Sequence, residues 1–525
     1  MRFCSLTLGC KVNQYETQGI GSILISRGHT PAKPGDGCDV CIINTCAVTA
    51  ESVRKSRQAV RRLKKLEPGA LIAVCGCLSQ LDPQAAVTLG ADLVGGSGDR
   101  YGFALEIEAT ADSATADSEI ADSEIADCEM PILTGGRLPP LRFTGVAEHY
   151  PTICRGDRPR SPARFTGAAE HYPAICRGDR PLSPAKQAQY TQRVTGDGRP
   201  CGQTMKTSGE PSLCFEELPP GIPAGRTRAL LKIQDGCDNY CTYCVIPYAR
   251  GHARSLLPEH AAGYAKRLSE QGFLEIVITG IEISSYGKDL PGNTSLTDVV
   301  REISAGAPRA RLRLGSLDPG SVSEKFCDEL SNIPNLCDHF HLSLQSGCNE
   351  TLKRMGRKYD TDTVYEAMSS LRRIFPNCGI TADIIVGFPG ETDAEFEQTL
   401  GFIKSAAFSD MHIFPFSSRP GTRAAEMPEQ IAKKIKHERA RTVAATAGEM
   451  ARRFRFDQIG KTVGVLFEHN RDGYWSGHSG NYIEVSVKDG GAKNIMHDVR
   501  IVSVEEKLVW GEIVQSPGVC GTHNK

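Results

Sequence analysis

The sequence predicts an α/β protein with several domains: an open parallel sheet, a partial barrel of strands and helices, and a small β-barrel. Three observations support this. Apolar runs alternate with helix-like stretches over residues 1–105 and again over 223–450, as in parallel α/β sheets. Residues 456–516 alternate β-forming residues with Gly and Asp-Gly turns, as in small all-β barrels. A chain of 525 residues is also too long for one hydrophobic core.

The composition is typical of a soluble globular protein, with 40% hydrophobic and 23% charged residues and a net charge of -1. No apolar run approaches the roughly 20 residues of a membrane span, and the first residues turn polar too soon for a signal peptide. We therefore expect a cytosolic protein. In that reducing compartment, many of its 20 cysteines are expected to bind metal or carry chemistry rather than form disulfides.

The first domain, residues 1–105, contains three apolar runs that read as buried strands: "FCSLTLG", "CDVCIINT" and "ALIAVCG". A basic helix lies between the second and third runs. Thr49 is suited to cap its start and Glu51 to occupy its first turn, where the helix dipole favours a carboxylate. This alternation predicts an open parallel sheet with helices packed against it.

Residues 106–222 break this pattern. An acidic repeat is followed by "RFTGVAEHYPTICRGDRPRSPA" and by a near copy of it, "RFTGAAEHYPAICRGDRPLSPA". Two copies rich in Pro, Gly and Arg cannot stack a continuous core, and their low hydrophobicity indicates a disordered insertion. A function in a bound state stays open. No role is assigned to the insertion's cysteines, which are Cys128, Cys154, Cys176, Cys201 and Cys214.

The second ordered region, residues 223–450, alternates strands such as "EIVITGIEI" and "GITADIIVGFPG" with amphipathic helices. This predicts a full or partial parallel barrel, whose ligands gather at the carboxyl ends of the strands. Its first strand leads into a loop with Cys237, Cys241 and Cys244 in the spacing C-x3-C-x2-C. Structural zinc needs four ligands, with His252 the nearest candidate for the fourth. A [4Fe–4S] cluster can instead be held by these three cysteines, with one iron left open.

Three further cysteines each follow a predicted strand of the first domain: Cys10, Cys46 and Cys77. Ends of parallel strands meet at one edge of a sheet, where such sheets bind ligands. We therefore expect these thiols to converge on a second metal site, although cysteine is often only a small core residue. Cys75 competes for the third position, but it alternates with Cys77 along the strand, and the "GCLSQ" context favours Cys77.

Together these motifs resemble the radical S-adenosylmethionine (SAM) methylthiotransferases. The three-cysteine loop with Tyr243 before its last cysteine is similar to that of radical SAM enzymes. The preceding α/β domain with its own cysteine triad narrows the resemblance to methylthiotransferases, and the last domain is similar to their TRAM module. The resemblance implies two [4Fe–4S] clusters, one on each triad. It further implies SAM bound to the open iron of the barrel cluster, and a C–H bond converted to C–S–CH3.

Within this family, "GCKVNQYE" and "HFHLSLQSGCNETLKRMGRKYD" are similar to the branch that acts on N6-threonylcarbamoyladenosine beside the anticodon of tRNA. This implies the tRNA anticodon stem-loop as partner; the sulfur and electron donors stay open. Glu282 departs from the branch, which often carries His there. The alternatives are isopentenyladenosine in tRNA, an aspartate of a ribosomal protein, or a non-catalytic iron–sulfur protein. Basic stretches at 55–65, 433–441 and 451–461 suit phosphates or are solvated helix faces.

Residues near the predicted strand ends are candidates for holding SAM, namely Ser316, Gln345 and Asp383. Arg357 and Lys358 either meet the acidic threonylcarbamoyl group or face solvent.

Two histidines share one strand face, His339 and His341. Without a third ligand in the sequence nearby, they are predicted to pack or to form hydrogen bonds.

Overall fold

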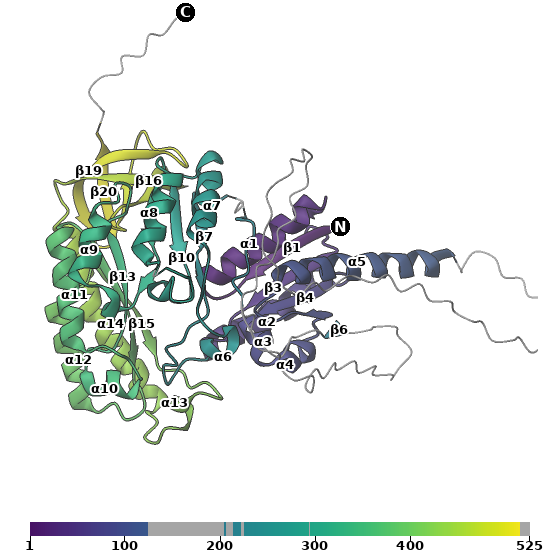
Figure 1. Cartoon of the computed structure of the whole chain (residues 1–525), viewed down its shortest axis with the longest axis horizontal. Helices are drawn as coiled ribbons and strands as arrows, with labels where there is room; N and C mark the ends of the chain where they lie inside the picture. Colours follow the sequence, from purple (N-terminus) through teal and green to yellow (C-terminus); the bar gives the residue numbers. More distant parts are fainter. Residues whose placement is uncertain (124–203, 206–213, 222–224, 293, 515–525) are drawn as a thin grey trace, which may run out of the picture. The chain divides into compact units, whose positions relative to one another are not determined.

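The computed structural model describes residues 1–123, 204–205, 214–221, 225–292 and 294–514 (Figure 1). The tandem copies of the insertion and four of its cysteines, Cys128, Cys154, Cys176 and Cys201, lie outside these residues. Over the described parts, no helix has the length and apolar character to cross a bilayer.

The first domain is built on a six-stranded parallel sheet with the order β2-β1-β3-β4-β5-β6. Alternate residues of its central strands enter two separate cores, one on each face, as expected for a covered parallel sheet. Thr49 accepts a hydrogen bond from Ser52 N and caps α2 as predicted. The strands are β1 (Arg2–Thr7), β2 (Thr30–Pro31), β3 (Val40–Thr45), β4 (Leu71–Gly76), β5 (Leu93–Val94) and β6 (Thr204–Met205). The helices are α1 (Lys11–Ser26), α2 (Ala50–Leu66), α3 (Cys77–Leu81), α4 (Pro83–Thr88) and α5 (Arg100–Ser123).

The chain returns to the first domain after the gap. Leu218 is buried in the core formed by α1, β3 and α5, and its carbonyl accepts a hydrogen bond from the Tyr15 hydroxyl at 2.8 Å. Helix α5 continues to Ser123. The ordered fold therefore extends past residue 105 and includes residues on the far side of the tandem repeats.

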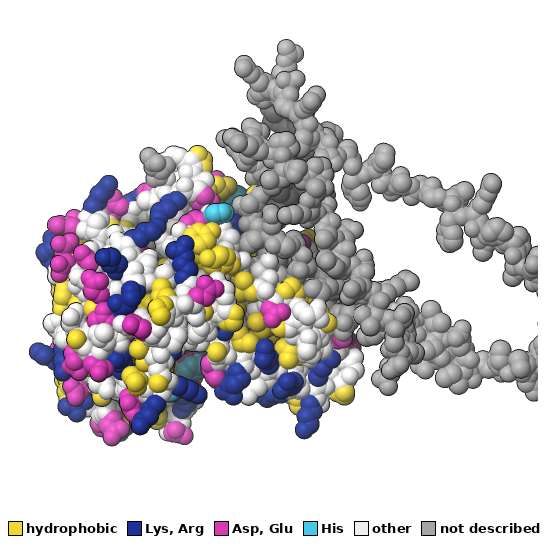
Figure 2. All heavy atoms as spheres, turned by 90° about the horizontal axis from the view of Figure 1, so that it is seen from below, with side chains coloured by type: hydrophobic (Ala, Val, Ile, Leu, Met, Phe, Trp, Pro, Cys, Tyr) yellow, Lys and Arg dark blue, Asp and Glu magenta, His cyan; other side chains and the backbone are white. Residues whose placement is uncertain are grey.

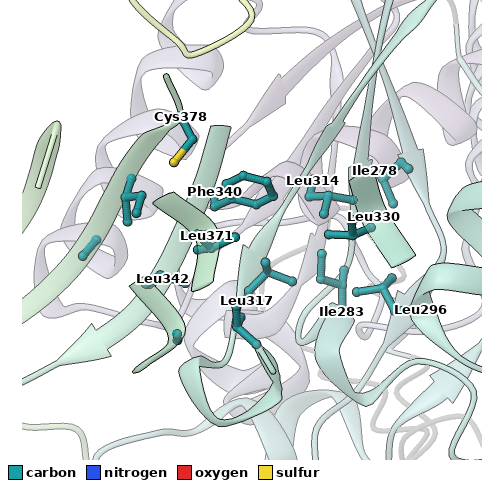
Figure 3. Close-up of a cluster of buried hydrophobic side chains, with 14 of the residues drawn as sticks. Ile278, Ile283, Leu296, Leu314, Leu317, Leu330, Phe340, Leu342, Leu371 and Cys378 are labelled. Carbon is teal, nitrogen blue, oxygen red and sulfur yellow. The ribbon is translucent and has the colours of Figure 1, made fainter. Parts of the chain in front are cut away.

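The second domain consists of two consecutive parallel sheets, β7-β10-β11 and β12-β13-β14-β15, and matches the predicted partial barrel. Side chains from these strands interleave with side chains of the surrounding helices (Figure 3). The strands are β7 (Arg228–Lys232), β10 (Glu275–Thr279), β11 (Arg311–Leu314), β12 (Ser316–Leu317), β13 (His339–Gln345), β14 (Gly379–Val386) and β15 (Asp410–Pro415). The helices around them are α7 (Pro258–Glu270), α8 (Leu296–Gly306), α9 (Glu324–Ser331), α11 (Thr361–Ile374), α12 (Asp393–Ala406) and α14 (Lys433–Phe456).

Short helices and strands lie within the loops that connect these longer elements. They are β8 (Gln234–Asp235), α6 (Ile246–Arg250), β9 (Arg254–Ser255), η1 (Ile283–Ser285), η2 (Pro319–Ser321), α10 (Asn349–Arg354) and α13 (Arg423–Glu426).

The last domain is a closed five-stranded barrel with the order β16-β17-β18-β20-β19. The predicted small β-barrel is thus confirmed, whereas its kinship to TRAM modules stays a prediction. Arg311 and Arg313 of β11 donate to its backbone carbonyls, for example to Gly464 at 2.9 Å and Gly480 at 2.8 Å. Its strands are β16 (Thr462–Arg471), β17 (Tyr474–Ser479), β18 (Glu484–Val487), β19 (Met496–Glu505) and β20 (Leu508–Ile513).

Charges of both signs are interspersed over the face seen in Figure 2. This agrees with the near-neutral net charge. A surface for a polyanion must therefore be local.

Candidate functional site

The three cysteines of the first domain lie at the carboxyl edge of its sheet. Cys10 precedes α1, Cys46 follows β3, and Cys77 begins α3 directly after β4. Their thiols are close enough to interact electrostatically: burial, opposed by Arg250 and helped by Cys10 and Cys46, raises the pKa of Cys77 to about 11. Gly9 has a φ of 103°, and a Cβ there would lie 2.9 Å from Cys46 Sγ. Only glycine therefore lets Cys10 and Cys46 approach one another.

Cys75 faces the opposite side of β4. Its side chain is buried in the core that contains Tyr15 and Phe103, whereas Cys77 belongs to a separate group with Ala47 and Val245. The sequence left Cys75 and Cys77 in competition for the third position, and the structure brings Cys77 to Cys10 and Cys46.

The second triad lies in the loop between β8 and α6. Burial raises the pKa of the Cys237 thiol to about 11 and that of Cys244 to about 12, and Cys241 adds to both shifts. Ile246 N donates to Cys244 Sγ at 3.4 Å. Thiolates are the ligands that iron needs, so in these sites metal binding and loss of the thiol protons are coupled.

Both triads fit a multi-iron cluster better than a single ion. In the described residues, the ligand atoms of His341, Asp383 and His412 lie close enough together to hold one metal ion. The thiols of the two cysteine triads do not form such a close group. Thiols around a [4Fe–4S] cluster each bind a different iron and must stand apart. His252 is exposed and pairs with Asp238 at 2.6 Å, so it does not complete a zinc site.

The sequence predicts that Arg357 meets the threonylcarbamoyl group or faces solvent, but the structure places it against the cysteine loop. Its side chain is only 5% exposed, and its Nη1 donates to Cys241 Sγ at 3.2 Å while its Nη2 pairs with Asp318 at 2.8 Å. Its Nε donates to the Tyr359 hydroxyl at 3.0 Å. All three nitrogens therefore hold the guanidinium against the cysteine loop. Lys358 is exposed.

Glu282 lies beside the same loop, at the start of η1. Burial and then the nearby Asp318 raise the pKa of this carboxyl to about 7, and Glu282 in turn raises the pKa of Cys237. From the sequence, Glu282 was only a departure from a family pattern. The structure makes it a partly buried acid close to the barrel triad.

The three predicted SAM contacts lie at different depths of the barrel. Ser316 begins β12 and is exposed, and Gln345 ends β13 in the left-handed region with a φ of 67°. Asp383 lies inside β14 rather than at its end, and its Oδ2 is 3.3 Å from His341 Nε2. Gln345 therefore lies at the carboxyl end of β13, whereas Ser316 is level with His341 and Thr381 in the sheet, so that Asp383 lies nearer the carboxyl edge than Ser316.

Hydrogen bonds account for the two histidines, as predicted. His341 Nδ1 and His339 Nε2 pair with the Thr381 hydroxyl at 2.8 Å and 3.0 Å. His339 also stacks on Tyr482 of the last domain, with ring centroids 4.6 Å apart.

A buried charge network joins the two cysteine sites, and sequence reasoning missed it. Glu16 of α1 forms ion pairs with Arg250 at 2.7 Å, Lys232 at 3.1 Å and Arg100 at 3.1 Å. All four side chains are fully buried. Arg250 ends α6, just after the barrel triad. Burial alone would lower the pKa of its guanidinium, but Cys77, Glu16 and Asp235 outweigh burial and raise it. A Glu within an otherwise apolar helix face was the signal available in the sequence.

Comparisons with known proteins agree with this architecture. Residues 231–403 match the Radical SAM superfamily, and residues 2–96 match a family described as uncharacterized protein family UPF0004. The chain is 30% identical to the threonylcarbamoyladenosine tRNA methylthiotransferase MtaB of Bacillus subtilis, over 92% of this chain and 89% of that protein. It is 31% identical to the MtaB of Thermotoga maritima, over 96% and 95%. A tRNA-2-methylthio-N(6)-dimethylallyladenosine synthase of Pelotomaculum thermopropionicum is 28% identical, over 89% and 86%.

The partial barrel with its three-cysteine loop therefore defines a radical SAM enzyme. The similarity along nearly the whole chain is more specific: the chain belongs to the radical SAM methylthiotransferase family. It is thus a transferase, and its cofactors are SAM and two [4Fe–4S] clusters, as the sequence predicts.

Proposed function

We propose that this enzyme is a tRNA methylthiotransferase that converts N6-threonylcarbamoyladenosine beside the anticodon to its 2-methylthio form. The observation that carries the proposal is the pair of cysteine triads, joined through Arg250 within one compact unit. Two relatives named for threonylcarbamoyladenosine support this base, at 30% and 31% identity. The relative named for dimethylallyladenosine, at 28%, makes that base the second candidate.

In this proposal Cys237, Cys241 and Cys244 hold the barrel cluster, and Cys10, Cys46 and Cys77 hold the other. When bound, the barrel cluster would pass the electron that cleaves SAM, and the other cluster would carry or receive the sulfur that is transferred.

The residues around the barrel triad hold SAM. The Glu282 carboxylate, close to Cys237, and the Asp318 carboxylate, close to Glu282, face its ammonium group. Ser316, Gln345 and Asp383, on three neighbouring strands, contact its ribose and amino-acid parts. Arg357 fixes the orientation of Cys241 through the hydrogen bond to its sulfur.

Helix α2 offers a local surface for the tRNA backbone. Its basic side chains lie on its exposed side, while Ser56, Ala59, Val60 and Leu63 face the core. The exposed cations are Arg54, Lys55, Arg57, Arg61, Arg62, Lys64 and Lys65, a density that suits phosphates.

Mass spectrometry of nucleosides from the tRNA of a deletion strain tests the substrate. We expect 2-methylthio-N6-threonylcarbamoyladenosine to disappear and its precursor to accumulate, and a plasmid copy to restore it. Intact methylthio nucleoside in the deletion strain would refute the assignment. Loss of the methylthio form of isopentenyladenosine, or a mass change in a ribosomal protein, would assign one of the alternatives instead.

A reaction with reconstituted protein tests catalysis itself. With dithionite and SAM, the enzyme should release 5′-deoxyadenosine. A non-catalytic iron–sulfur protein would release none.

A further inference from the structure

Lys11 directly follows Cys10 and begins α1. Its side chain is exposed, so it is accessible to a ligand at the first cysteine site. Within the described ranges, no carboxylate forms an ion pair with it and no side-chain hydrogen bond involves it. Its electrostatic neighbours are Arg313, Arg228, Glu275 and Asp383, all from strands of the barrel. Lys11 therefore points from the edge of the first domain toward the barrel.

The acidic groups that Lys11 faces already have partners. Glu275 is shared by Arg311 at 2.6 Å and Arg313 at 2.7 Å, and Asp383 pairs with His341 at 3.3 Å.

Arg228, the remaining neighbour, pairs with Glu468 at 3.1 Å. Arg228, Arg311 and Arg313 each have a carboxylate partner at 3.1 Å or less, whereas within the described residues no ion pair involves Lys11. A cation without such a partner favours an anionic ligand.

The proposed substrate carries such an anion. The threonylcarbamoyl group on N6 ends in a carboxylate, whereas an isopentenyl group is apolar and uncharged. In the adenine ring, only N1 separates C2, which receives the sulfur, from C6, which bears N6. When C2 faces the site of Cys10, the substituent on N6 therefore lies near Lys11, the next residue of the chain. Arg357 is already bound through each of its three nitrogens, to Cys241, Asp318 and Tyr359.

We propose that Lys11 binds the carboxylate of the threonylcarbamoyl group and thereby selects this base over adenosines without a negative charge on N6. This inference rests on the proposed function. Lys11 is a specificity residue here: it contacts the substituent and takes no part in the bond changes at C2.

Binding to anticodon stem-loop RNAs tests the assignment. Fluorescence anisotropy with reconstituted enzyme compares an RNA carrying threonylcarbamoyladenosine with the same RNA carrying plain adenosine. One charge-assisted hydrogen bond corresponds to a preference of about tenfold for the modified RNA. Lys11→Met should abolish this preference and leave the affinity for the unmodified RNA unchanged. Lys11→Arg should retain most of it.

Lys325→Met is the matched control, because Lys325 is an exposed lysine of α9, 86% accessible; it should keep the wild-type preference. Iron content is measured for every variant to confirm that both clusters are present. The proposal is overturned if Lys11→Met keeps the preference, or if it weakens both RNAs equally, as loss of a phosphate contact would.

Turnover separates this inference from the proposed function. Wild-type enzyme that methylthiolates the threonylcarbamoyl RNA supports the function, whatever Lys11→Met does. Wild-type enzyme that converts the isopentenyl RNA and not the threonylcarbamoyl RNA overturns both.

Discussion

Arg250 donates a hydrogen bond to the Glu16 carboxylate at 2.7 Å, although 233 residues of sequence lie between them. Glu16 belongs to the helix that follows Cys10, and Arg250 to the helix that follows Cys244. Arg250 also donates to Asn13 Oδ1 at 2.8 Å. Each cysteine site is therefore anchored to the other through fully buried, charged hydrogen bonds.

Glu16→Gln should destabilise the protein by about 3 kcal/mol, because it leaves buried cations without their shared anion. We expect this in urea unfolding, together with lower iron content at the first-domain site. Glu51→Gln is the control: Glu51 is exposed and pairs with Arg54 on the surface of α2, where such a pair contributes about 0–1 kcal/mol. Equal stability of the two variants would show that the network does not hold the domains together.

Cys77→Ser should remove about half of the bound iron, whereas Cys75→Ser should leave iron content unchanged. The two residues are both fully buried neighbours of one strand end, but Cys77 alone lies near Cys10 and Cys46. Iron and sulfide assays after anaerobic reconstitution measure the difference. The reverse result would make Cys75 the third ligand.

Arg357→Met should make the barrel cluster harder to reduce. The substitution removes a positive charge beside the cluster site and the N–H group that donates to Cys241 Sγ. SAM cleavage at a fixed potential should fall about tenfold, as for loss of one charge-assisted hydrogen bond. A redox titration followed by electron paramagnetic resonance measures the midpoint potential directly. An unchanged potential with full iron content would leave Arg357 a purely structural role.

The pKa of Glu275 predicts a pH dependence of stability. Burial alone would raise this pKa, but Arg313 and Arg311 outweigh it and hold it at about 2, below the usual 4.5. Because the folded-state pKa is lowered, the stabilisation is complete above about pH 4.5 and is lost as the pH falls toward 2. Its size is about 3 kcal/mol. Glu275→Gln should therefore reduce the melting temperature at pH 6 and narrow its difference from wild type at pH 3. A constant difference between pH 6 and pH 3 would contradict this.

The three folded regions, the cap of α2 and the choice of six cysteines as candidate ligands could be predicted from the sequence, because they depend on local spacing. Alternation along a strand and C-x3-C-x2-C in a loop need no knowledge of distant residues.

Only the tertiary structure decided which partners these residues have. It turned Cys77 rather than Cys75 toward the other two thiols, placed Arg357 on Cys241, and joined Glu16 to Arg250. It also placed Lys11 near charged residues of the barrel, where no ion pair involves it within the described residues. A buried charge needs partners, and folding brings these partners from distant parts of the chain. No local sequence pattern connects those parts, so the pairs cannot be predicted from the sequence.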